Sequence, residues 1–420
     1  MTSARVALAH SEEYLGTPGS YSREQLDLVT QMVRDVSDGS VGGIDRVVQP
    51  GQTVVIKINT VIPSPPDAGF TTDPRLLEAL IRLVSECNPG KIQICERSAL
   101  GGDTLAAMEV CGIKAVADRT GAELLPFDNV PFDMVSMAGT STFAEFPVPR
   151  PVIDADVYIG LPKMKVHVHT MLTCALKLQF GNLPDYGWMN QCHRDDIHQK
   201  IVNLTKAAKP DWFLVDSLYA CQGNGPFSPY PEDLIKDFNT IAAGADPVAV
   251  DTVVEALMGW ENPGSNAPYI RLAAAQGLGT DDLSQIEIVG VPLDQVTRRF
   301  NQADTRLQGL FPNVNVIVGA ACVPGCTALV RMALDALAVD GTLEKLNQPL
   351  HIFVGKQFEP LNRDLSGPVI VYGDCAKPML DIYPDAAYWG SCDEYPHCSP
   401  VWSNLPDVGL CSHVHSLVGD

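Results

Sequence analysis

Apolar residues along the chain fall into two recurring patterns. Short continuous apolar runs over 54–59, 92–96 and 157–160 predict buried strands. Between and before them, apolar positions three and four residues apart predict helices over 23–36, 74–84 and 104–119. The pair Asp73-Pro74 supplies an N-cap and a first-turn proline for the second of these helices. This β-α-β-α order predicts an α/β fold with mostly parallel or mixed sheets covered by helices.

The second half of the chain continues the alternation less regularly. Short β signals over 134–149 precede a predicted helix over 195–208, a strand over 212–216, a helix that opens at Asp246-Pro247 and a strand over 286–290. A weakly patterned stretch, 291–310, then separates this region from a second β-α-β block that begins at Val314. We predict a larger module, 1–300, and a smaller cysteine-rich module, 311–420, with a division of the larger one near 125–155 left open.

Composition and charge argue against two classes of binding partner, nucleic acids and membranes. The formal net charge of -21 argues against a nucleic-acid binder, because phosphate contacts need clustered lysine and arginine. No stretch reaches the ~18 apolar residues of a membrane span, and the apolar run 6–9 is too short for a secretory signal. We therefore expect a soluble, cytoplasmic protein that binds neither nucleic acid nor a membrane.

A basic segment follows the predicted strand 157–160. It carries Lys163, Lys165, His167, His169 and Lys177, with no acidic residue between Asp156 and Asp185. Because ligands of open α/β sheets sit at the carboxyl ends of the strands, this segment predicts a site for a carboxylate or phosphate. The alternative is a solvated loop whose lysines pair with surface acids. Joint metal ligation by the two histidines is the less favoured alternative.

Several motifs in order resemble the domain of unknown function 362 family (DUF362). They are Val55-Ile56-Lys57-Ile58-Asn59, Thr71-Thr72-Asp73-Pro74-Arg75, Gly160-Leu161-Pro162-Lys163-Met164-Lys165, Ala175 to Asn182, Asn224-Gly225-Pro226 and Gly244 to Asp251. The chain is more weakly similar to the nickel-pincer lactate racemase fold, which also carries lysine and histidine near its substrate. Many members of the family hold an iron–sulfur module in a ferredoxin insert, which this chain lacks. The resemblance implies no defined reaction.

Cysteines are concentrated near the C-terminus, and several follow predicted strands. Cys322 and Cys326 come after the strand that begins at Val314, Cys375 follows 369–373, and Cys392 and Cys398 follow 386–390. Carboxyl ends of parallel strands share one edge, and four thiolates there suit a 4Fe–4S cluster or, alternatively, zinc. Our preferred ligands are Cys322, Cys326, Cys375 and either Cys398 or Cys392. Inert buried cysteines are the competing interpretation.

These features predict an iron–sulfur enzyme that acts on a small anionic substrate, with redox or Lewis-acid chemistry at the cluster. His167, Lys163 and His169 are the candidate catalytic residues, and the candidate substrate-binding residues are Lys165, Lys177, Asn59, Asn182 and Asp216. Two alternatives remain: proton or hydride transfer like that of lactate racemase, and a non-catalytic electron carrier or metal-handling protein. A redox partner and a homodimer are left open.

Overall fold

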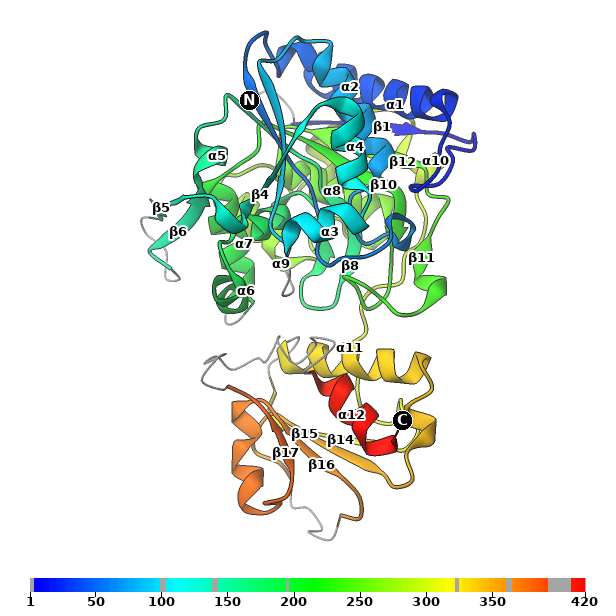
Figure 1. Ribbon diagram of the computed structural model, residues 1–420, viewed down its shortest axis with the longest axis vertical. Coiled ribbons are helices and arrows are strands. Elements are labelled where there is room, and N and C mark those ends of the chain that lie inside the picture. Colours follow the sequence, from blue (N-terminus) through cyan, green and yellow to red (C-terminus); the bar gives the residue numbers. More distant parts are fainter. Residues whose placement is uncertain are drawn as a thin grey trace.

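The computed structural model describes residues 4–98, 103–137, 143–193, 196–321, 325–359, 365–391 and 409–419. Its strands and helices form two lobes, each around its own sheet (Figure 1). The mixed α/β architecture agrees with the fold class that the apolar pattern predicts. No helix within these ranges is long and apolar enough to cross a membrane.

The larger sheet contains eleven described strands, and its main path runs β13-β1-β12-β10-β7-β2-β3-β4. Along this path β12 is antiparallel to both of its neighbours, whereas the other pairs are parallel. The strands are β1 (Ala4–His10), β2 (Thr53–Lys57), β3 (Lys91–Glu96), β4 (Glu123–Pro126), β7 (Val157–Gly160), β8 (Lys163–His167), β9 (Met171–Thr173), β10 (Trp212–Cys221), β11 (Leu234–Ile235), β12 (Thr240–Gly244) and β13 (Ile286–Gly290).

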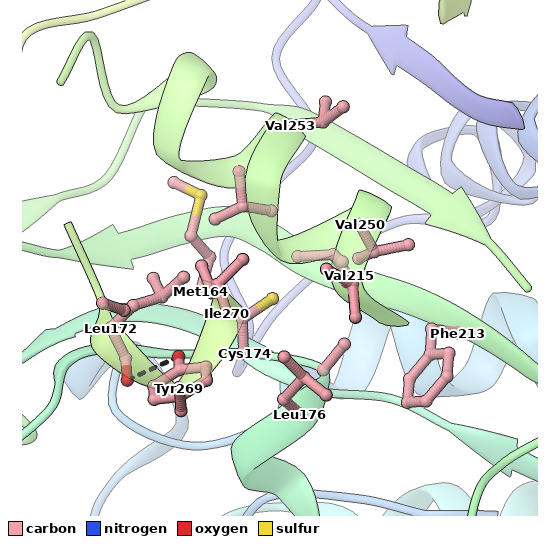
Figure 2. Close-up of a cluster of buried hydrophobic side chains, with 14 of the residues drawn as sticks. Met164, Leu172, Cys174, Leu176, Phe213, Val215, Val250, Val253, Tyr269 and Ile270 are labelled. Carbon is pink, nitrogen blue, oxygen red and sulfur yellow. Dashed lines mark hydrogen bonds between the residues drawn. The ribbon is translucent and has the colours of Figure 1, made fainter. Parts of the chain in front are cut away.

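Helices cover both faces of this sheet, because alternate strand residues enter two separate cores. In β10, Trp212 and Leu214 join the core under α1 and α2, while Phe213 and Val215 join the core under α7, α8 and α9. Figure 2 shows the second core, in which Phe213 and Val215 lie near side chains from α8 and α9. The helices of this lobe are α1 (Arg23–Val41), α2 (Pro74–Ser85), α3 (Thr104–Val110), α4 (Ile113–Thr120), α5 (Arg150–Ile153), α6 (Tyr186–Cys192), α7 (Ile197–Ala207), α8 (Pro247–Leu257), α9 (Pro268–Ala275) and α10 (Leu293–Val296).

The second lobe is a four-stranded parallel sheet in the order β14-β15-β16-β17. Its strands are β14 (Val314–Val318), β15 (Leu350–Val354), β16 (Val369–Tyr372) and β17 (Ala387–Trp389), and its helices are α11 (Gly325–Val339) and α12 (Leu410–Val418). Leu329, Leu334 and Leu337 of α11 pack on the sheet. Figure 1 shows α11 on the side of this sheet that faces the larger lobe.

Two local predictions differ from the structure, and the β signals predicted over 134–149 agree with it. The single helix predicted over 104–119 is divided into α3 and α4, because Gly112 takes φ +77°, a left-handed conformation in which a helix cannot continue. The stretch 291–310, predicted as a linker, contains α10 and buries Phe300, whose carbonyl accepts a hydrogen bond from Trp260 Nε1 at 3.1 Å. Residues Phe132–Ser136 and Glu145–Pro149 form a hairpin, β5-β6, outside the main sheet.

Candidate functional site

The basic segment begins with β8, which pairs with β10 on one side and with β9 on the other. Successive residues of β8 point to opposite faces of the sheet. Met164 and Val166 point into the core under α8 and α9, where Figure 2 labels Met164. Lys163, Lys165 and His167 therefore occupy the opposite face of the strand, as period-two alternation requires. All three side chains are buried. The strand thus carries a row of buried basic groups on a single face.

A cavity of about 110 Å³ opens beside this row. Its polar lining consists of Asn59, Glu96, Arg97, Lys165, His167, His169, Thr173, Lys177 and His193. Its apolar lining consists of Val61, Leu178, Phe180, Met189, Pro226, Phe227, Leu329 and Met332. Leu329 and Met332 belong to α11, so both lobes contribute to the cavity. Such junctions at the strand ends of α/β sheets commonly form ligand sites.

Several predicted site residues line this cavity: Asn59, Lys165, His167, His169 and Lys177. Lys163, Asn182 and Asp216 are not among the residues that line it, and their predicted contact with a substrate stays a prediction. Lys163 Nζ pairs with Asp216 Oδ1 at 3.1 Å, and both side chains are fully buried. Asn182 bonds to Tyr158 and Gln179 behind the cavity wall. Each of these polar groups thus has a buried partner within the protein.

His167 and His169 lie on different elements. β8 ends at His167, and residues 168–170 form a turn, so His167 and His169 are not alternate residues of one strand. The turn brings their ring centroids to 5.9 Å, and the His169 backbone N–H donates to His167 Nδ1 at 3.0 Å. His193 follows α6, and its ring centroid lies 6.0 Å from that of His169 in an edge-to-face arrangement. Pattern reasoning missed His193 because it lies alone, outside the basic segment.

Burial keeps the three imidazoles neutral. Desolvation lowers the pKa of His169 to about 4 and that of His193 to about 3, and it lowers the pKa of His167 well below its ordinary value. The positive charge of Lys177 lowers all three further. His169 Nε2–H donates to the Gly325 carbonyl at 3.2 Å and His193 Nδ1–H to the Met189 carbonyl at 2.8 Å. Their other ring nitrogens therefore carry lone pairs that can accept a proton.

Two lysines give the cavity its positive character. Lys165 Nζ donates to Asn59 Oδ1 at 2.8 Å and to the Phe70 carbonyl at 2.7 Å. Lys177 is 6 % exposed, and within the described ranges its ammonium has no hydrogen-bond or ion-pair partner. Desolvation lowers the pKa of Lys165 to about 7, and desolvation together with the charge of Lys165 lowers the pKa of Lys177 well below its ordinary value.

The single acid among the described lining residues is already engaged. Glu96 Oε1 accepts a hydrogen bond from Lys57 Nζ at 2.7 Å, and Glu96 Oε2 accepts one from the Thr60 backbone N–H at 3.0 Å. Gly181 lies against this pair so closely that a Cβ there would overlap both side chains. The Lys57–Glu96 pair is therefore a built part of the cavity wall, and Glu96 does not neutralise Lys177.

The segment that carries Lys177 is held from behind. Leu176–Asn182 forms the 3-10 helix η4, and Asp251 of α8 accepts hydrogen bonds from the Ala175 and Leu176 backbone at 2.7 and 3.1 Å. Burial raises the pKa of Asp251 to about 7. Asp251 thus anchors η4 on the opposite side from the cavity, and it fixes where Lys177 emerges.

Two of the five predicted metal ligands, Cys326 and Cys375, lie within the described residues. Cys322, Cys392 and Cys398 lie outside the described residues. Cys326 lies on the first turn of α11, and its Sγ is 3.1 Å from where a Cβ on Gly373 would be. Cys375 follows two residues after Gly373 and is exposed. Among the described side chains, no three histidine, cysteine or acidic groups are arranged to hold one metal ion.

Part of the larger lobe matches a family model. Residues 54–255 match the model of the domain of unknown function DUF362. This match confirms the resemblance of the motifs to that family. A protein of Synechocystis sp. described as thylakoid-associated is 28 % identical over 226 residues, which cover 51 % of this chain and 65 % of that protein. The chain thus matches less than two thirds of that relative's length.

Two solved structures share a distant likeness. A protein from Thermotoga maritima aligns over 90 % of this chain and 93 % of its own, with 11 % identity and a TM-score of 0.34. The lactate racemase apoprotein from Thermoanaerobacterium thermosaccharolyticum aligns over 93 % of this chain and 88 % of its own, with 12 % identity and a TM-score of 0.31.

Proposed function

We propose that the cavity between the two lobes binds a small organic anion and carries out proton transfer on it. The observation that carries this proposal is the buried ammonium of Lys177 beside Lys165, which has no hydrogen-bond or ion-pair partner among the described residues. Burying an unpaired cation destabilises a protein, so such a group persists where a ligand supplies the missing negative charge. The interior cavity supplies the space for that ligand.

The size and lining of the cavity narrow the ligand. A volume of about 110 Å³ is comparable to apolar cavities that hold a benzene molecule, which suits a ligand of about six non-hydrogen atoms. Phe180, Phe227 and Met332 give it an apolar wall, whereas Lys165 enters from β8 and Lys177 from η4. A short-chain carboxylate matches this combination, with its anionic head at the lysines and its carbon chain against the aromatic rings.

The cavity side chains have complementary roles in this proposal. Lys165 and Lys177 bind the anionic group, and the lone pairs on His169 and His193 accept a proton from the ligand. Arg97, which pairs with Asp128 at 3.5 Å, also lines the wall. Lys165, His169 and Lys177 are buried, and a low-dielectric surrounding strengthens their electrostatic interactions with a ligand.

A metal centre beside the cavity is a second element of the proposal. Cys326 opens the helix that bears Leu329 and Met332, and its neighbour Gly325 accepts the hydrogen bond from His169. Cys375 lies in the 3-10 helix Asp374–Asp381, directly after Gly373, which lies against Cys326. We propose that both thiolates help to hold a 4Fe–4S cluster, with zinc as the alternative, and that the bound cluster supplies redox or Lewis-acid chemistry. An electron carrier without a substrate is the competing function.

Calorimetric titration with butanoate, inorganic phosphate and ethylammonium tests the anion site. We expect butanoate to bind, Lys177→Met to weaken its affinity by about 10- to 100-fold through loss of a charge-assisted hydrogen bond, and ethylammonium not to bind. Lys236→Met, at an exposed position of the same lobe, is the control and should bind butanoate like the unmodified chain. Equal butanoate affinity in all three proteins would refute the proposed function.

A further inference from the structure

Lys177 is placed as a nucleophile as well as a cation. Its backbone is anchored by Asp251 through η4, and Thr205 Oγ1 donates to the Leu176 carbonyl at 2.9 Å. Its side chain lines the cavity, with Nζ 5.7 Å from the centroid of the Phe180 ring. No described acceptor holds the amine in one direction. The nitrogen is therefore positioned by rigid backbone and exposed to whatever the cavity binds.

Lys165 holds its proton more strongly than Lys177 does. Lys165 donates to two oxygen acceptors, Asn59 Oδ1 and the Phe70 carbonyl, and these bonds favour its charged form. Lys177 has no such acceptors, and the neighbouring charge of Lys165 further disfavours a second charge. When one proton is lost from the pair, Lys177 loses it. A neutral lysine next to a cation in an apolar site has a reactive lone pair.

We propose that Lys177 Nζ forms an imine with the carbonyl carbon of a small 2-oxo acid, while Lys165 holds the carboxylate of the same molecule. This inference rests on the proposed function and deepens it, because it specifies that the anion carries a carbonyl next to its charge. The size of the cavity limits the acid to a short chain, and Thr173 lies in the same wall. The Thr173 hydroxyl is buried without a described hydrogen-bond partner, so it can donate to the carbonyl oxygen.

The reaction needs no oxidant or reductant. The Nζ lone pair forms a bond to the carbonyl carbon, and the π electrons of the carbonyl move to its oxygen. A proton passes from nitrogen to that oxygen, with the bare nitrogen of His169 or His193 as a carrier, and gives a carbinolamine. Loss of water then breaks the carbon–oxygen bond and leaves the imine. Amine and carbonyl together give imine and one water. A protonated imine withdraws electrons from the adjacent carbon, which eases proton removal there.

Hydride trapping tests the proposal on the full chain. The protein is incubated with pyruvate and sodium borohydride, which reduces an imine to a stable secondary amine, and the labelled residue is located by peptide mass spectrometry. We expect Lys177 to gain the mass of the acid minus one oxygen, at a rate at least 10-fold above that of exposed Lys236. Butanoate, which lacks the ketone, should slow the labelling by competition and form no adduct.

Variants separate the possible outcomes. Lys177→Met should abolish the adduct, and a cooperative thermal transition at or above that of the unmodified chain is the check on its fold. An adduct that moves to Lys165 in this variant at an unchanged rate would overturn the assignment to Lys177. Butanoate binding without any pyruvate adduct in the unmodified chain would overturn the imine and leave the anion site standing. Absence of butanoate binding would instead overturn the proposed function itself.

Discussion

At the residue scale, the buried charges fall into two groups that differ in their partners. Lys57–Glu96, Lys163–Asp216 and Arg75–Asp73 are paired at 2.7, 3.1 and 2.6 Å, and each pair is almost fully buried. Such pairs maintain the wall of the site but leave nothing for a ligand. Lys165 and Lys177 form the second group, which has no described acidic side chain as an ion-pair partner. Buried charges of this kind reduce the stability of a fold, and they occur mainly at functional sites.

The first prediction concerns the pH dependence of stability. Burial lowers the pKa of Lys165 to about 7 and depresses that of Lys177, whereas both titrate near 10.4 in the unfolded chain. Between these values the unfolded chain binds more protons than the folded one. The lysine contribution to the free energy of unfolding therefore rises as pH increases from about 7 to about 10, by at most about 1.4 kcal/mol per pH unit for each lysine.

Urea unfolding at about pH 7, 8.5 and 9.5 checks whether the free energy of unfolding rises with pH. Lys177→Met removes one of the two titrating groups, so the variant should gain stability at pH 7 and show a shallower rise with pH. Lys236→Met, which changes an exposed lysine, should follow the unmodified chain. Parallel curves for the Lys177 variant and the unmodified chain would show that Lys177 is not desolvated as the structure implies.

At the scale of elements, the site depends on close contacts between segments distant in sequence. η4 is held by Asp251 of α8, and Gly181 within η4 lies against the Lys57–Glu96 pair that joins β2 and β3. The loop Asn224-Gly225-Pro226 in turn supports the end of β8, because the Gly225 carbonyl accepts the Val168 backbone N–H at 2.9 Å. Several of the family motifs therefore surround one cavity.

The second prediction tests the contact of η4 with this ion pair. In Gly181→Ala the new methyl group would overlap Glu96 Oε1 and Lys57 Nζ and force the pair apart. We expect a loss of about 3 kcal/mol in the free energy of unfolding and weaker butanoate binding. Gly19→Ala is the matched control, since a Cβ at Gly19 meets no atom within 4 Å. Equal stability of the two variants in urea titrations would contradict the predicted overlap.

The third prediction concerns the seam between the lobes. Asp335 of α11 is fully buried, and it accepts hydrogen bonds from Asn224 Nδ2 at 2.8 Å, Arg331 Nε at 2.8 Å and the Tyr230 hydroxyl at 3.1 Å. Asp335→Asn replaces acceptors with donors, so we expect a loss of about 2 to 3 kcal/mol in stability. Butanoate affinity should fall as well, because α11 carries Leu329 and Met332 into the cavity.

Asp340→Asn is the control for this substitution. Asp340 follows the same helix and pairs with His415 at 2.8 Å, but both side chains are nearly half exposed. An exposed pair contributes little, so the change should alter stability by about 0.5 kcal/mol or less. If thermal unfolding and butanoate titration move equally in both variants, α11 does not close the cavity through Asp335.

At the scale of the whole molecule, the second lobe contributes to a site that the first lobe mostly builds. α11 supplies two apolar lining residues and the Gly325 carbonyl that orients His169. The same helix begins at the proposed thiolate centre, with Cys326 on its first turn. The arrangement joins the proposed cluster to the proposed substrate site through one helical turn. The compartment of the chain and its partners stay predictions.

The fourth prediction concerns metal content. Anaerobically purified protein should be brown and contain about four irons per chain, and Cys326→Ser or Cys375→Ser should lower the iron content. Cys95→Ala and Cys111→Ala are controls, because burial raises the pKa of both thiols and keeps them protonated in apolar surroundings. Equimolar zinc without sulfide would replace the cluster by the alternative metal. A metal-free, colourless protein would exclude both centres.

Sequence pattern alone determined what local physics controls. Apolar periodicity located β2, β3, β7, α1 and α2, because burial of one helical face or of a whole parallel strand repeats along the chain. The run of basic residues without acids identified the segment 163–177. In that segment, Lys165, His167 and Lys177 do line the cavity, and their chemical roles remain predictions.

Tertiary structure decided which charges are satisfied. The sequence shows Lys163 and Lys165 as equivalent lysines on the same face of a strand, yet Lys163 meets Asp216 and Lys165 meets two neutral oxygens. That difference depends on β10 and on residues 59–70, which are remote in the chain. His193, Leu329 and Met332 reach the cavity from α6 and α11 by packing alone, and neither helix carries a local signal for it. Pairing and enclosure are long-range properties, and they are what separates a binding residue from a buried ion pair.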